Sequence, residues 1–132
     1  MVDRDLIGFE YPSHRATVEA WQLRLFGAAI GANGEGTPVP PTFGYALKSA
    51  VPEPLARFRA LGIDTSRLLH GDQSFAYHRP LRAGETYSVK TRIADVYERK
   101  GGSLTFLVEE TRILDRDDAP VVTLRSTFVI RA

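Results

Sequence analysis

The hydrophobic and polar positions divide the chain into a helical, loop-rich front and a strand-rich back. Between residues 18 and 30, apolar side chains recur at the i, i+4, i+7 and i+8 spacing of an amphipathic helix: Trp21, Leu25, Ala28 and Ala29. The glycines that begin at Gly31 end this helix, and the prolines that follow predict an extended loop. A second helix is predicted over residues 53–60, with Pro54 in its first turn and a glycine after its end.

Four strands are predicted in the back of the chain, at residues 68–78, 86–97, 104–114 and after a polar turn at 115–118. The second alternates so that these side chains share one face: Tyr87, Val89, Thr91, Ile93 and Tyr97. The third places Leu104, Phe106 and Val108 on one face before its alternation weakens, which is typical of a bulge or of burial on both faces. The last directs inward Val122, Leu124, Phe128 and Ile130. Helices followed by long antiparallel strands indicate an α+β fold.

Composition mainly excludes classes of partner and site. Residues 1–132 suffice for one domain, and 43% apolar with 25% charged residues is ordinary for a soluble globular protein. A net charge of +1 gives no reason to expect a nucleic-acid or membrane partner, and the acidic start and lack of a long apolar run predict a cytoplasmic protein. Because there are no cysteines and only three histidines, neither disulfides nor a metal site is expected, and no cofactor is indicated.

Polar side chains interrupt the first predicted strand. His70, Asp72 and His78 have the same parity, so an unbroken strand would direct all three to one face. His70 and Asp72 would lie about 6.6 Å apart along the strand, as a general acid/base pair or as a structural hydrogen-bonded pair. Gln73 would face the opposite side with Phe75 and Tyr77, where its amide must find hydrogen-bond partners if it is buried.

Residues 70–86 join a His-Gly-x-Gln string to aromatic residues and a Pro-Leu-x-Ala-Gly turn, and residues 40–43 read Pro-Pro-Thr-Phe. Together with the helix that ends at Gly31, these motifs resemble the N-terminal, type I fatty-acid-synthase-like dehydratase half-domain of the MaoC-like hydratase/dehydratase superfamily. The resemblance covers about residues 6–131. It implies a hot-dog fold, in which a curled antiparallel sheet wraps around a helix.

The resemblance also implies how the chain functions. In catalytic halves of this superfamily, the helix ends in a G-D-x-N-P-x-H motif whose Asp and His act as the acid/base pair on an acyl thioester. Here Ala32 stands where the Asp would be, and no histidine follows before His70. Glu35 is a weak substitute, because a lone loop glutamate is usually solvated. The resemblance therefore implies a non-catalytic, substrate-binding subunit of a heteromeric (R)-specific enoyl-thioester hydratase or 3-hydroxyacyl-thioester dehydratase.

Such a subunit would bind an acyl-CoA or acyl carrier protein thioester, paired with a catalytic MaoC-like subunit or as a homodimer. Five residues are candidates to line its acyl slot: Phe43, Tyr45, Gln73, Phe75 and Tyr77. Gln73 could equally brace a subunit interface, and core packing is the expected role of Trp21 and Phe26. Two alternatives stay open. One is a self-sufficient enzyme, either a hydratase that uses His70 and Asp72 or a hot-dog thioesterase, and the other is an acyl-CoA-binding module. No G-x-S-x-G motif indicates a serine nucleophile.

Overall fold

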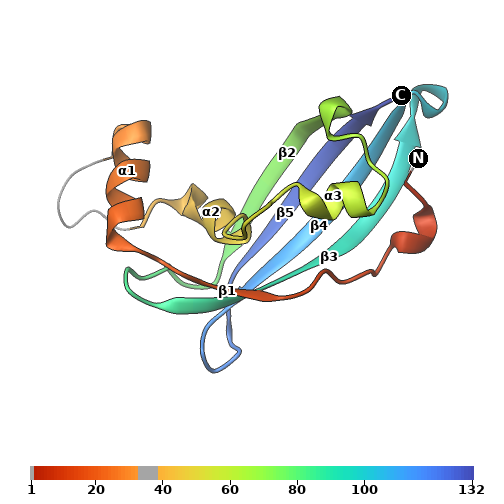
Figure 1. The fold of residues 1–132 in the computed structure, drawn as a ribbon. Helices are drawn as coiled ribbons and strands as arrows, with labels where there is room; N and C mark the ends of the chain where they lie inside the picture. Colours follow the sequence, from red (N-terminus) through yellow and green to blue (C-terminus); the bar gives the residue numbers. More distant parts are fainter. Residues whose placement is uncertain (1, 33–38) are drawn as a thin grey trace.

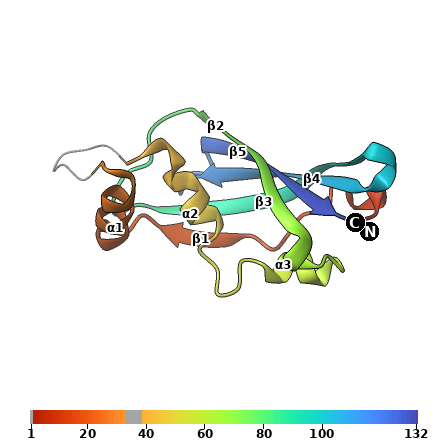
Figure 2. The same cartoon turned by 90° about the horizontal axis from the view of Figure 1, so that it is seen from above.

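The computed structural model describes residues 2–32 and 39–132 and contains one five-stranded antiparallel sheet with strand order β1-β3-β4-β5-β2. The strands are β1 (His14–Thr17), β2 (Leu68–Tyr77), β3 (Thr86–Arg99), β4 (Leu104–Leu114) and β5 (Pro120–Arg131). The helices are α1 (Ala20–Ile30), α2 (Gly44–Lys48) and α3 (Ala56–Ala60), with 3-10 turns at Arg4–Leu6, Pro41–Phe43, Thr65–Arg67 and Lys100–Gly102. Helices α2 and α3 lie over one face of the sheet, and α1 lies at one end of it (Figures 1 and 2). The expected α+β class is confirmed.

Helix α1 presents its predicted apolar stripe to solvent. Trp21 is 53% exposed and Leu25 is 65% exposed, whereas Phe26 packs edge to face on Phe43 with ring centroids 5.2 Å apart. The prediction that Trp21 belongs to the core is therefore wrong, and the prediction for Phe26 is confirmed. The reason is the position of α1 at the end of the sheet, where only its Phe26 side meets the rest of the protein.

The sheet contains the four predicted strands and a fifth, β1, that the sequence pattern did not reveal. Strand β1 has only four residues and pairs with β3 through His14 opposite Val89. Helix α2 was also missed, because its five residues follow a proline-rich segment that reads as a loop. In β5 the predicted inward face is confirmed, since Leu124 and Phe128 are buried while Arg125 is exposed.

One predicted face is wrong, that of β3. In β3 the register shifts between Ile93 and Asp95, so Val96 is buried and Tyr97 turns to the opposite face, where its ring stacks on Phe106 at 4.9 Å. A bulge adds one residue to the strand and reverses its alternation. In β4 the predicted shared face of Leu104, Phe106 and Val108 is confirmed, and it is the outer face; because Val108 is also buried, the strand is buried on both faces. The helix-covered face carries the odd-numbered residues: Thr105, Leu107, Glu109, Thr111 and Ile113.

The core forms two clusters on the helix-covered face of the sheet. One gathers around Phe43, Tyr87 and Leu124, beneath α2. The other gathers around Phe58 of α3 and Phe128 of β5. No helix within residues 2–32 and 39–132 has both the length and the apolar character needed to cross a membrane.

Candidate functional site

A bulge in β2 separates the two residues predicted as an acid/base pair. His70 lies opposite Phe128 and Asp72 opposite Thr127, so the register shifts at Gly71 between them. His70 consequently shares the helix-covered face with Phe128, and their rings lie 4.9 Å apart. Asp72 lies opposite the half-buried Thr127 on the other face of the sheet. The prediction that His70 and Asp72 project from one face is wrong, and the two side chains are not positioned to work together.

Glycine is suited to the bulge position because a neighbouring strand approaches it closely. A Cβ atom at Gly71 would lie 2.9 Å from Cγ2 of Val129 and 3.3 Å from the carbonyl oxygen of Thr127. Any larger residue would push β2 away from β5 or displace Val129. The His-Gly-x-Gln string therefore has a structural consequence, since the bulge places both His70 and Gln73 on the helix-covered face.

Past the bulge, the helix-covered side of β2 carries Gln73, Phe75 and Tyr77, opposite Ser126, Leu124 and Val122 of β5. The Phe75 and Tyr77 rings stack with centroids 6.5 Å apart, and the hydroxyl of Tyr77 donates to the carbonyl oxygen of Pro41. The ring of Tyr45 on α2 meets the ring of His70 at 5.7 Å. These residues are referred to below as the wall: Tyr45, His70, Gln73, Phe75 and Tyr77.

The wall remains partly open to solvent because β2 is an edge strand. Its free edge pairs with no other strand of the described chain, and the helices cover β2 only in part, so Gln73 and Phe75 are half-buried and Tyr77 is 36% exposed. Phe43, the fifth predicted binding residue, is 1% exposed and belongs to the core behind the wall. The structure thus brings four of the five predicted residues together and places Phe43 apart from them.

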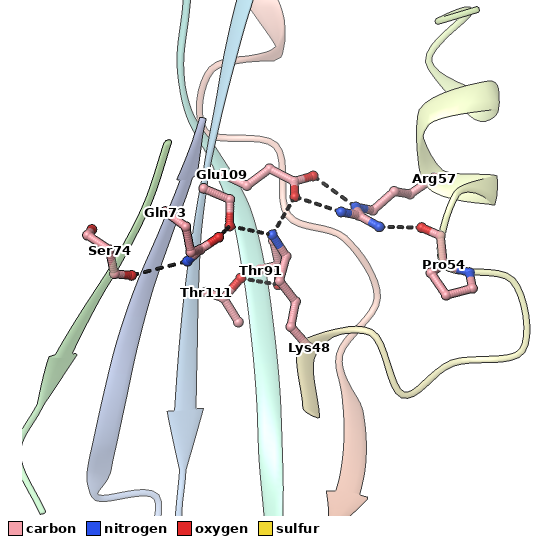
Figure 3. Close-up of polar contacts among 9 residues, drawn as sticks. Lys48, Pro54, Arg57, Gln73, Ser74, Thr91, Glu109 and Thr111 are labelled. Atoms are coloured by element: carbon pink, nitrogen blue, oxygen red, sulfur yellow. Dashed lines mark hydrogen bonds and ion pairs between the residues drawn. The ribbon is translucent and has the colours of Figure 1, made fainter. Parts of the chain in front are cut away.

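Three charged side chains meet under the wall, and the sequence analysis predicted none of them. Glu109 on β4 is fully buried and receives both Nε and Nη2 of Arg57 at 2.9 Å, in a two-pronged contact. Nζ of Lys48, at the end of α2, lies 2.8 Å from Oε1 of the same carboxylate. Figure 3 shows this arrangement. Lys48, Arg57 and Glu109 are referred to below as the ion cluster.

A hydrogen-bond chain joins the ion cluster to the wall. Nζ of Lys48 donates to Oγ of Ser126 at 3.0 Å, and that hydroxyl donates to Oε1 of Gln73 at 2.6 Å (Figure 3). The side-chain oxygen Oε1 of Gln73 therefore already accepts a hydrogen bond, and the NH2 group of the same amide faces away from Ser126. One hydrogen of that group is donated to the carbonyl oxygen of Ser74 at 3.1 Å.

Burial and charge compete in the ion cluster. Burial raises the pKa of Glu109, but the charges and hydrogen bonds of Lys48 and Arg57 outweigh it, and the pKa lies below its usual value. Burial lowers the pKa of Lys48, the charge of Arg57 adds to that effect, and Glu109 opposes both. No local sequence pattern predicts this cluster, because its members come from two helices and a strand that are far apart in sequence. A glutamate flanked by Val108 and Glu110 reads as an ordinary surface position.

The lowered pKa of Glu109 makes stability depend on acid pH. A carboxyl whose pKa is lower in the folded than in the unfolded chain stabilises the fold above its ordinary pKa, and that contribution is lost as pH falls through the folded value. We expect the free energy of unfolding, measured with urea, to fall steeply from about pH 4.5 downward. The Glu109→Gln variant should show a shallower slope in that window. A Glu98→Gln variant, which alters an exposed carboxylate, should keep the wild-type slope, and equal slopes in all three proteins would contradict the assignment.

Comparison with known proteins extends the picture. Residues 5–124 match the family described as the FAS1-like dehydratase domain region. A UPF0336 protein of Saccharopolyspora erythraea is 33% identical over 145 residues, which cover 98% of this chain and 92% of that protein. The similarity therefore extends over nearly the whole length of both chains.

Solved structures share the fold. One is a C-terminally truncated HadBC complex, a 3R-hydroxyacyl-ACP dehydratase of Mycobacterium tuberculosis, with a TM-score of 0.76 and 23% identity over 95% of this chain and 97% of that one. Another is a MaoC-like dehydratase of Phytophthora capsici, with a TM-score of 0.75 and 23% identity over 100% of this chain but 50% of that one. The expected hot-dog architecture is confirmed.

Proposed function

Because the chain belongs to the family of FAS1-like dehydratase-domain regions, we propose that it is the non-catalytic, substrate-binding subunit of a heteromeric (R)-specific enoyl-thioester hydratase or 3-hydroxyacyl-thioester dehydratase. The observation that carries the proposal is the wall, an amide and aromatic surface left half-open at a free sheet edge. A second subunit placed against β2 would close it into a slot. An acyl chain bound there would be lined from both sides.

The catalytic groups are assigned to the partner. On the family resemblance, Ala32 would stand where catalytic halves carry an aspartate, and the bulge at Gly71 puts Asp72 on the far face from His70. Glu35, the remaining sequence candidate for a base, lies outside the described residues. In hydration, the partner's Asp and His would activate water for attack on C3 and deliver the proton to C2. This chain would hold the thioester in reach of them.

Gln73 is the polar group of the wall best placed to hold a thioester. Its Oε1 already accepts from Ser126, so its amide hydrogens are the part of the side chain free to bind a ligand. One of them contacts the carbonyl oxygen of Ser74 and the other can donate to the carbonyl of a thioester or of the pantetheine arm. Phe75 and Tyr77 would supply apolar surface for the first carbons of the acyl chain.

The partner surface would extend beyond β2 to α1. Besides Trp21 and Leu25, Ile30 is 52% exposed, and three large apolar side chains on one short helix are costly to leave in water. Two of the similar structures support the proposal that two such units work as a pair. The Phytophthora protein has a chain about twice this length, and the Mycobacterium structure is a HadBC complex. The partner we propose is a catalytic MaoC-like subunit, with a homodimer as the competing arrangement.

The test is hydration of trans-2-enoyl thioesters, followed by loss of absorbance of the conjugated double bond. We expect no activity from this chain alone and clear activity when it is mixed with a MaoC-like subunit that carries an intact G-D-x-N-P-x-H motif. Running the assay with CoA and with acyl carrier protein thioesters identifies the carrier. Activity of the chain alone would overturn the proposal and favour a self-sufficient enzyme.

A Gln73→Leu variant tests the role of the wall in the mixed enzyme. We expect kcat/KM to fall about tenfold to a hundredfold, as for the loss of a hydrogen bond to a reacting group. Ser74→Ala is the matched control, because its side chain follows Gln73 but is exposed on the opposite face. Similar losses in both variants would remove Gln73 from the proposed site.

A further inference from the structure

A cavity of about 220 Å³ opens on the side of the ion cluster away from Gln73. It lies between the N-terminal segment, the end of α2 and the start of α3, and it is lined by Tyr11, Pro12, His14, Lys48, Val51, Glu53, Pro54, Arg57 and Thr91. None of the wall residues lines it, so it is separate from the proposed acyl slot. Its chemistry can be worked out from the groups around it.

Positive charge is in excess at the inner end of this cavity. Lys48 and Arg57 both line it, and Glu109 behind them is the carboxylate that both contact. The Lys48 side chain is 3% exposed and that of Arg57 is 20% exposed, so one buried and one partly buried cation share a single buried anion. Glu53 offers little compensation, because its side chain is 72% exposed and its carboxylate pairs with Arg59 at 3.3 Å. An uncompensated buried charge is costly, and a second anion would balance it.

Hydrogen-bond donors are also in excess. The hydroxyl of Tyr11 is buried beside Glu109 and Arg57, yet it makes no hydrogen bond within the described residues. Burial raises the pKa of this phenol, and the nearby Glu109 adds to the effect, so the group is a neutral donor at ordinary pH. Arg57 uses three of its five N–H groups, two on Glu109 and one on the carbonyl oxygen of Pro54. The cavity therefore contains donors that lack an acceptor.

We propose that this cavity binds a short-chain carboxylate. One carboxylate would match the single excess charge, and its two oxygens could accept from the Tyr11 hydroxyl and a free N–H of Arg57. The remaining lining includes Pro12, Val51 and Pro54, which suits a few methylene groups better than the fully hydrated surface of a phosphate. A volume of about 220 Å³ accommodates a ligand of butyrate size.

The experiment is calorimetric titration of the full chain with butyrate, acetate, inorganic phosphate and butyramide. We expect saturable binding of butyrate, weaker binding of acetate, and no binding of butyramide, which has the shape of butyrate without its charge. Tyr11→Phe should weaken butyrate binding about tenfold, the effect of one hydrogen bond to a charged group. It should leave the melting temperature of the free protein unchanged or higher, because the lost hydroxyl has no partner.

Tyr97→Phe is the matched control, since it removes the same hydroxyl from a ring that stacks on Phe106 on the other face of the sheet. It should bind butyrate as the wild type does. Equal weakening by the two variants, equal affinity for butyrate and butyramide, or no saturable binding of butyrate would each overturn the proposal. Preferential binding of phosphate would overturn the assignment to a carboxylate. None of these results depends on hydratase activity, so the proposal stands or falls separately from the proposed function.

Discussion

Replacing Glu109 with glutamine is expected to lower the free energy of unfolding by about 3–5 kcal/mol. The carboxylate is fully buried and holds Lys48 at 2.8 Å and Arg57 at 2.9 Å, so its neutral substitute leaves a buried and a partly buried cation without their shared anion. Glutamine has nearly the same shape, and a large effect would therefore come from charge and not from a cavity. Chemical denaturation at neutral pH measures it directly.

Two further variants show whether the loss has this cause. Glu110→Gln removes the next carboxylate on β4, which lies on the opposite face with partly exposed partners, and should cost no more than about 1 kcal/mol. Lys48→Met should cost less than Glu109→Gln, because the Glu109–Arg57 pair then remains balanced. If Glu110→Gln matched Glu109→Gln, or Lys48→Met exceeded it, the charge argument would be contradicted.

The sequence pattern predicted the elements of this fold better than it predicted which way their side chains point. Four of the five strands and the hairpin between β3 and β4 were predicted from the residue pattern and turn residues, and β5 has the expected inward face. The bulges at Gly71 and in β3 were not predicted, because one extra residue leaves the composition of a strand unchanged while reversing its faces. At Gly71 that reversal separates His70 from Asp72, which removes the simplest reading of the two residues as a catalytic pair.

From the residue pattern, the candidate site was predictable only where its residues are close in sequence, whereas Tyr45 was predicted through the family resemblance. Gln73, Phe75 and Tyr77 share one strand, and their common parity brought them together in the sequence as well as in the structure. The ion cluster depends on contacts between positions 48, 57 and 109, which no local period encodes. Its position between the wall and the cavity is purely a product of tertiary packing. Through Ser126, it links the amide of Gln73 to the cations that line the cavity.

Phe128→Ala is expected to cost about 3–5 kcal/mol of unfolding free energy, comparable to the loss of the buried carboxylate. The ring is 1% exposed and packs edge to face on Phe58 with centroids 4.9 Å apart. On its other sides it meets the ring of His70 at 4.9 Å and Nζ of Lys48 at 5.3 Å. Its removal would therefore open a cavity at the junction of α3, the wall and the ion cluster.

The matched control is Phe106→Ala, which removes the same side chain from the half-buried outer face, where its ring stacks on Tyr97 at 4.9 Å. That loss should be smaller, on the order of 1–2 kcal/mol, because Phe106 already contacts water in the folded state. Phe128→Leu should recover much of the stability by refilling most of the volume. Since Phe128 also supports His70 and Lys48, the alanine variant should weaken partner-dependent hydration even at temperatures where it remains folded. A destabilised variant with unchanged kcat/KM in the mixed enzyme would show that the core beneath the wall does not position it.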